Sequence, residues 1–316
     1  MTDPVHLSVH LIEQPDYAQN ALDRTVGGLL QAVTEGLGNG LRVLVKPNLI
    51  TATNAGISCT HPGVVLAVCG FFLARGDSVQ VGDSPAFGSA RYVAGRSGLS
   101  RALSRLPVTL VGFDRGRRVV LSGGQSAAIA VQALECDLLV NVPKLKAHAQ
   151  MRVSGCVKNL FGCVVGLRKA LAHARLGNDP GRFSRLILDI GDHLPHTLHL
   201  VDGVQAMHTT GPVHGRRLDF GLLGAAADSI ALDTALYTLL GLTPEQVPLW
   251  REALRQERPG AFASTLEFPV LEPGHFAGRG FELPTNLTPI SFHPLQLLQS
   301  ALRRLTLTTM NKLAGR

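Results

Sequence analysis

The stretch from Asp137 to His148 reads DLLVNVPKLKAH, an apolar run that ends at a proline and continues into alternating lysines. Short runs rich in Val, Leu and Ile between helical segments are typical of buried parallel strands and their crossover helices. Pro143 lacks a backbone N–H and favours an extended chain, so Lys144, Lys146 and His148 should point to one side. We therefore expect a strand over 137–142, followed by an extended segment that presents two ammonium groups and an imidazole together.

The same alternation continues along the chain and predicts an α/β fold. The expected architecture is a mostly parallel sheet with helices on both faces, which would allow two lobes around a central cleft. The other predicted strands are Val5–His10, Leu41–Lys46, Ser78–Gly82, Val108–Val111, Leu198–Asp202 and Gly221–Ala225. The predicted helices are Pro62–Arg75, Ser89–Leu99, Ser126–Leu134, Arg182–Leu194, Asp228–Leu240 and Pro244–Gln256. Within the fifth helix segment, Asp228 is expected to cap the N-terminus and Asp233 to be buried against a loop amide or a lysine.

The domain organisation follows from where this pattern stops. Residues 1–257 are predicted to form one α/β core, and residues 258–316 a Pro-rich appendage, because repeated prolines break regular structure there. Near its end, residues 294–313 place leucines on one helical stripe, at positions 295, 298, 302 and 305. This amphipathic helix is expected to pack on the core or on a twin subunit, and the second arrangement would make a homo-oligomer.

Composition excludes several classes of protein. Hydrophobic residues make up 45% of the 316 residues and charged residues 17%, which excludes a disordered, collagen-like or coiled-coil chain. No stretch approaches the roughly 20 apolar residues of a membrane helix, and the N-terminus lacks a signal region, so we expect a cytoplasmic protein. The net charge of +7 comes with 5% aromatic residues and no massed basic run, which indicates a basic surface rather than a nucleic-acid-binding one.

Lysine placement is the main functional clue. Of the 30 basic residues six are lysines, and five of these lie between positions 46 and 169, so arginine serves as the ordinary surface cation. Predicted strands end in Lys46-Pro47-Asn48, Asp83-Ser84-Pro85, Pro143-Lys144 and Asp202-Gly203, and ligands of open parallel sheets bind outside such carboxyl ends. We therefore predict one cleft that binds a small anionic metabolite, a carboxylate or a phosphate. The residues predicted to hold it are Lys46, Asn48, Lys144, Lys146, Lys158 and Asn159.

The sequence leaves three alternatives for the chemistry at this cleft. In the first, the protein is an enzyme in which His148, kept neutral by the two lysines, and Asp83 or Asp202 handle protons or a metal ion. In the second, Cys59, Cys156 and Cys163 hold an iron–sulfur cluster or a metal, although no CxxC pair is present. In the third, the protein is a noncatalytic anion-binding accessory module. The cofactor stays unknown, with a divalent metal and an iron–sulfur cluster as candidates.

Taken in order along the chain, the motifs resemble the DUF362 family. The similarity covers about residues 40–250 and rests on VKPN at 45–48, CTHP at 59–62, VGDSP at 81–85, NVPKLKAH at 141–148, SGCVKNLFGCVVG at 154–166, LVDGVQAMHTTGPVHG at 200–215 and AADSIALDTALYTLLG at 226–241. Many relatives resemble redox-associated proteins because they carry an appended ferredoxin-type cluster domain, which needs closely spaced cysteines. This sequence lacks those cysteines. The resemblance therefore implies a member without that domain, and it leaves the reaction unassigned.

Overall fold

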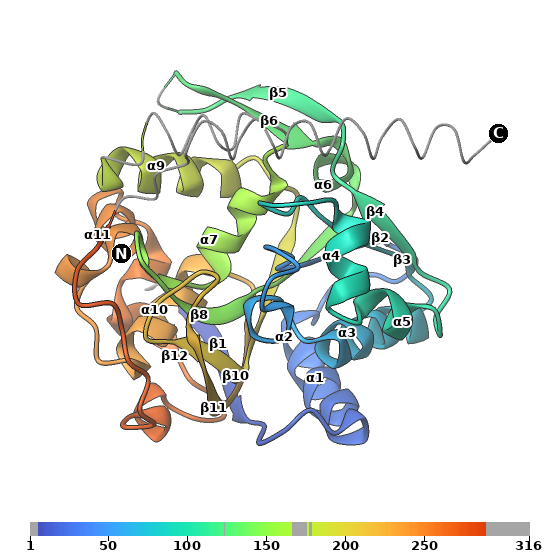
Figure 1. The fold of residues 1–316 in the computed structure, drawn as a ribbon, viewed down its shortest axis with the longest axis horizontal. Coiled ribbons are helices and arrows are strands. Elements are labelled where there is room, and N and C mark those ends of the chain that lie inside the picture. The colour runs from blue at the N-terminus through green and yellow to red at the C-terminus, as the bar shows by residue number, and fades with distance from the viewer. Residues whose placement is uncertain (1–5, 123, 166–175, 177–178, 289–316) are drawn as a thin grey trace.

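The computed structural model describes residues 6–122, 124–165, 176 and 179–288. They form one ten-stranded sheet in the order β12-β1-β11-β10-β7-β2-β3-β4, with β8 beside β10 and β9 beside β8 (Figure 1). The strands of this sheet are β1 (Leu7–Glu13), β2 (Arg42–Pro47), β3 (Ser78–Asp83), β4 (Thr109–Gly112), β7 (Leu138–Val142), β8 (Lys144–His148), β9 (Arg152–Ser154), β10 (Thr197–His208), β11 (Arg216–Ala226) and β12 (Leu266–Glu267).

The order of the strands creates a position where a ligand can bind. Strands β4, β3, β2, β7 and β10 are parallel to one another. Strand β11 lies between β10 and β1 and runs antiparallel to both. The chain passes outward from β2 to β3 and β4, and then returns to the other side of β2 as β7. Connections therefore leave β2 and β7 in opposite directions, and ligands of open α/β sheets bind at the carboxyl ends beside such a switch point.

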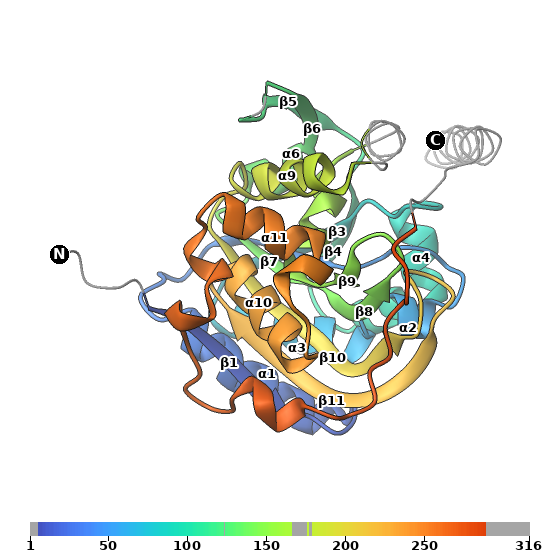
Figure 2. The ribbon, with the colours of Figure 1, turned by 90° about the vertical axis from the view of Figure 1, so that its left-hand side faces the viewer.

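Helices cover both faces of the sheet, as predicted. The helices are α1 (Gln19–Val33), α2 (Ala55–Ser58), α3 (Pro62–Ala74), α4 (Ala90–Arg96), α5 (Leu99–Leu103), α6 (Val131–Glu135), α7 (Cys156–Leu160), α9 (Pro180–Gly191), α10 (Ser229–Leu239) and α11 (Pro248–Arg255). Within β2, Val43 and Val45 join the apolar cluster of α1, α3 and α5, whereas Leu44 joins that of α7, α9, α10 and α11. Because successive side chains of a strand alternate between faces, the two clusters lie on opposite faces of the sheet (Figure 2).

The helix predicted over residues 126–134 was wrong. Residues 126–134 do not form one helix: Ser126–Ala130 is strand β6, which pairs with β5 (Gly116–Val120) in a separate hairpin, and helix α6 follows. Ala127 and Ile129 are buried at alternate positions, so the apolar residues follow the period of a strand. The strands predicted over 198–202 and 221–225 are confirmed, and each is part of a longer strand in the antiparallel pair of β10 and β11.

The appendage lies partly within the described residues. Residues 258–288 add β12 as a parallel edge strand beside β1, and Phe276 is buried in the core. The predicted helix over 294–313, and with it the predicted oligomer, lies outside the described residues.

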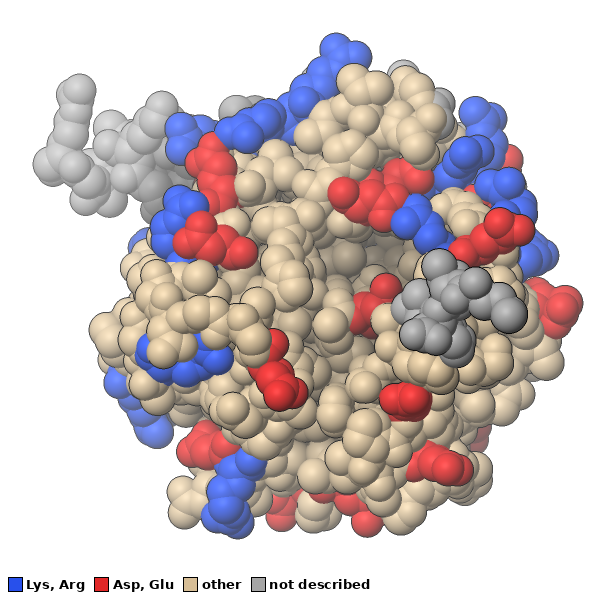
Figure 3. All heavy atoms as spheres, turned by 180° about the vertical axis from the view of Figure 1, so that it is seen from behind, with Lys and Arg blue, Asp and Glu red and all other residues tan. Residues whose placement is uncertain are grey.

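The surface carries charged side chains of both signs. In the view from behind, Lys and Arg side chains are interspersed with Asp and Glu along the upper rim (Figure 3). No described helix has the length and apolar character needed to cross a membrane.

Candidate functional site

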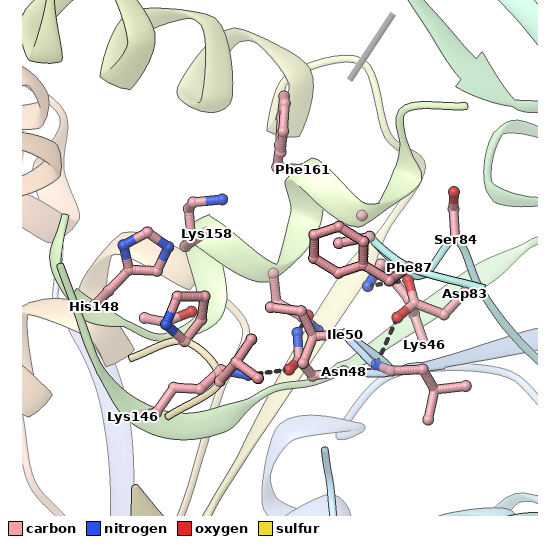
Figure 4. A pocket seen from close by; sticks show the side chains of 17 residues that line it. Lys46, Asn48, Ile50, Asp83, Ser84, Phe87, Lys146, His148, Lys158 and Phe161 are labelled. Carbon is pink, nitrogen blue, oxygen red and sulfur yellow. Dashed lines mark hydrogen bonds and ion pairs between the residues drawn. The ribbon is translucent and has the colours of Figure 1, made fainter. Parts of the chain in front are cut away.

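A cavity of about 210 Å³ lies at the carboxyl ends of β2 and β3, enclosed by β8 and α7 (Figure 4). Seven of the predicted site residues line it, although they come from separate parts of the chain. They are Lys46, Asn48, Asp83, Lys146, His148, Lys158 and Asn159. The structure thus brings these seven residues to one cavity, as their positions at strand ends predicted. The remaining wall includes Ile50, Ser84, Phe87, Ser154, Phe161, Pro212 and Val213.

One wall is a buried ion pair. Lys46 Nζ lies 2.8 Å from Asp83 Oδ1 and also donates to the carbonyl oxygen of Pro47 at 3.2 Å. The other carboxylate oxygen of Asp83 accepts the backbone N–H of Leu49 at 2.7 Å. A methyl group at Gly162 would lie 2.5 Å from Lys46 Nζ and 2.8 Å from Asp83 Oδ1, so a side chain there would displace the ion pair.

Lys146 has a different environment. Its ammonium nitrogen, on a side chain only 1% exposed, donates to the carbonyl oxygen of Ser58 at 2.6 Å and to Asn48 Oδ1 (Figure 4). Both acceptors are neutral. Burial lowers the pKa of Lys146 to about 8, and the nearby lysines act in the same direction while Cys59 and Asp83 act against it.

A chain of amide side chains runs from Lys146 into the protein. Asn48 Nδ2 donates to Asn159 Oδ1 at 2.7 Å, and Asn159 Nδ2 donates to Asn141 Oδ1 at 2.8 Å. Asn141 Nδ2 then lies 3.0 Å from His199 Nδ1, which accepts because burial lowers the pKa of His199 to about 3 and keeps its ring neutral. Each amide oxygen thus accepts from the preceding donor in the chain, and this orients Asn48 so that its Oδ1 faces the Lys146 ammonium.

His148 and Lys158 line the same cavity. His148 Nδ1 accepts the backbone N–H groups of Gln150 and Met151, both at 3.2 Å, so a neutral ring carries its proton on Nε2. Lys158 Nζ lies 4.8 Å from the centre of the Phe161 ring, a cation–π distance. In this tautomer His148 would donate through Nε2, and its role in handling protons or a metal ion stays a prediction.

Lys144 and Asp202 lie outside the cavity, which corrects the prediction that they belong to the same cleft. Lys144 Nζ lies 2.9 Å from Asp202 Oδ2, and both side chains are fully buried. Tyr17 donates to Asp202 Oδ1 at 2.8 Å and accepts from Lys144 at 2.7 Å, while the backbone N–H of His61 donates to Asp202 Oδ2 at 2.8 Å. The pair is a structural link between β8, β10 and the segment before α1, and no motif pointed to Tyr17.

The structure does not bring Cys59, Cys156 and Cys163 together as the three-thiolate prediction requires. Cys59 lies in the cluster of α1 and α3, whereas Cys156 and Cys163 lie in the cluster on the other face of the sheet. Among the described residues, no group of three or more His, Cys, Asp or Glu side chains is placed to hold a metal ion. Burial, with Asp233 adding to it, raises the pKa of the Cys156 thiol well above its ordinary value.

The expectations for Asp228 and Asp233 are confirmed. Asp228 accepts the Ala231 N–H at 2.7 Å as the N-cap of α10. Asp233 accepts the N–H groups of Cys156 and Val157 at 2.6 and 3.0 Å, and burial raises its pKa to about 7. This carboxyl group fixes the start of α7, the helix that carries Lys158 and Asn159.

Known proteins were compared with this chain. A thylakoid-associated protein of Synechocystis sp. is 36% identical over 304 residues, which cover 94% of each chain. A solved structure, the lactate racemase apoprotein from Thermoanaerobacterium thermosaccharolyticum, aligns with a TM-score of 0.44 and 13% identity over 72% of this chain and 56% of that chain. That likeness is too weak to carry an argument. The model of the DUF362 family, a domain of unknown function, matches residues 43–238. The chain therefore belongs to the DUF362 family.

Proposed function

We propose that this protein is an enzyme that binds a small anionic metabolite, a carboxylate or a phosphate, in the cavity beside β2 and β8. The observation that carries the proposal is the charge of the cavity wall. The wall carries three lysines, at positions 46, 146 and 158. Among the described lining residues the only acidic side chain is that of Asp83, which is paired with Lys46. Because charges interact strongly in a partly dry cavity, this excess of positive charge favours an anionic ligand.

Hydrogen-bond donors are available to orient such an anion. A charged Lys146 has three N–H bonds, of which Ser58 and Asn48 accept two, so one is left for a ligand. His148, which lines the same cavity, carries its proton on Nε2 when its ring is neutral. We assign Lys146, Lys158 and His148 to anion binding, and Lys46 with Asp83 to the wall that keeps the site in shape.

Titration calorimetry with inorganic phosphate and with oxalate tests the binding step. Lys158→Gln removes one positive charge from the wall and should weaken binding of the preferred anion tenfold or more, because a charge-assisted hydrogen bond contributes about 1.5–3 kcal/mol. The matched control is Arg118→Gln, which removes the same charge from an exposed position on β5 and should leave affinity unchanged. Equal affinity in wild type and Lys158→Gln would contradict the assignment.

The enzymatic part of the proposal rests on Lys146, since a buried amine whose pKa lies near neutrality is suited to chemistry at physiological pH. A protein that binds the anion but converts none of a panel of carboxylates and phosphates would instead be an anion-binding accessory module.

We further propose a cytoplasmic location. High-speed centrifugation of a cell lysate should leave the protein in the supernatant. Recovery with the membranes would contradict this and would place the chain with its thylakoid-associated relative.

A further inference from the structure

Three buried lysines near the cavity differ in their partners. Lys46 is paired with Asp83 at 2.8 Å and Lys144 with Asp202 at 2.9 Å. Lys146 is buried as deeply, yet among the described residues no carboxylate oxygen lies within 4.0 Å of its Nζ. A buried ammonium without a counterion is costly, so this position favours the neutral amine more than the other two do.

The hydrogen bonds of Lys146 also direct its nitrogen. The carbonyl oxygen of Ser58 and Asn48 Oδ1 each accept one N–H. A neutral amine has two N–H bonds and one lone pair, so these two acceptors use both N–H bonds and leave the lone pair at the remaining position. Since the Lys146 side chain lines the cavity, a ligand there could approach this nitrogen.

We propose that Lys146 is a nucleophile that forms an imine with a small carbonyl compound carrying a carboxylate or phosphate. This inference rests on the proposed function, because the anionic group would be held by Lys158 and His148 while the carbonyl carbon lies against Lys146. A cavity of about 210 Å³ has room for a small ligand of this kind. A lysine amine that is desolvated and lies near other cations is activated for this chemistry.

The step balances without a further reactant. The Nζ lone pair attacks the carbonyl carbon and forms the N–C bond, and the carbonyl oxygen takes a proton from the nitrogen. The resulting carbinolamine loses its hydroxyl group with the second N–H proton as water, which leaves the C=N bond. Nothing is oxidised or reduced. At pH 7 about a tenth of an amine with a pKa near 8 is neutral, enough to start the reaction.

Reductive trapping tests the proposal on the full chain. The protein is incubated with glyoxylate and cyanoborohydride, digested, and mapped by mass spectrometry, which is simple because the chain has six lysines. We expect one stable adduct, on Lys146, with Lys46 and Lys144 unmodified because their amines are held as ion pairs. Acetaldehyde, which has the carbonyl but no anionic group, should label Lys146 at least tenfold more slowly at equal concentration. Adducts spread over several lysines, or absent from Lys146, would overturn the proposal.

Two variants separate the reacting group from its surroundings. Lys146→Arg keeps the charge and should form no adduct at this position. Asn48→Asp keeps the lysine but places a carboxylate beside its Nζ, which favours the ammonium form, so the labelling rate should fall at least tenfold. An unchanged labelling rate in Asn48→Asp would contradict the role of the missing counterion.

Oxalate binding distinguishes the two proposals. Oxalate is an anion that cannot form an imine, and its affinity reports the anion site alone. Oxalate binding without a Lys146 adduct would overturn the imine proposal and leave the anion site standing. Absence of binding by oxalate and phosphate would overturn the proposed function itself.

Discussion

Replacing Lys144 by Met should destabilise the protein severely although the substitution lies outside the cavity. The change leaves the buried Asp202 carboxylate without its cation, while the N–H of His61 and the hydroxyl of Tyr17 still donate to it. Removing one partner of a buried ion pair costs about 3–5 kcal/mol. Because two donors remain, we expect the free energy of unfolding to fall by about 3 kcal/mol. Replacing a lysine in a solvated loop would, by contrast, lower the free energy of unfolding only slightly.

Equilibrium unfolding in urea, followed by circular dichroism, measures this loss. The matched comparison is Lys146→Met on the same strand, which leaves no carboxylate unpaired and removes a buried cation without a counterion. It should cost less than Lys144→Met, because the cost of leaving two neutral acceptors unsatisfied is offset by no longer burying an ammonium without a counterion. The double variant Lys144→Met with Asp202→Asn should recover part of the loss. The reasoning would be refuted if Lys144→Met lost less than about 1 kcal/mol, or if Lys146→Met were the less stable of the two.

Two further substitutions follow from the same contacts. Below pH 6.5 His199 becomes protonated in the unfolded chain but not in the folded chain, where its pKa is about 3, so the free energy of unfolding should fall by about 1.4 kcal/mol per pH unit on acidification. Urea unfolding of His199→Asn at pH 5 and 7 should show a flatter pH dependence. An unchanged pH dependence would count against a neutral buried ring. Gly162→Ala should weaken oxalate binding at least tenfold, because the new methyl group displaces Lys46 and Asp83. The control Gly70→Ala, whose new methyl group meets nothing within 4 Å, should bind oxalate as the wild type does. If calorimetry gave Gly162→Ala the same affinity for oxalate as the wild type, the Lys46–Asp83 pair would not shape the site.

The parallel part of the sheet was predictable because its strands are buried on both faces. Leu44 and Val45 face opposite apolar clusters, so the run is apolar without alternation and is bounded by polar loops. Residues 126–130 were mistaken for a helix because alanine-rich sequence fits both periods, and the pairing partner in β5 decided in favour of the strand.

The candidate site was predictable to the extent that it follows the strand ends. Lys46 and Asp83 end neighbouring parallel strands, and this alone brings them to one edge of the sheet. Lys144 was assigned to the cavity because it shares a strand with Lys146, but its partner Asp202 comes from β10, and no local pattern reveals such a long-range pairing. The amide chain from Asn48 to His199 likewise depends on tertiary contacts between residues far apart in the sequence.

A crystal structure of the protein grown with oxalate would show whether the cavity binds an anion. We expect oxalate inside the cavity, with its carboxylate oxygens within hydrogen-bond distance of Lys146 Nζ and Lys158 Nζ, and with the Lys46–Asp83 pair intact. Oxalate bound only at other positions, with the cavity empty at a saturating concentration, would contradict it.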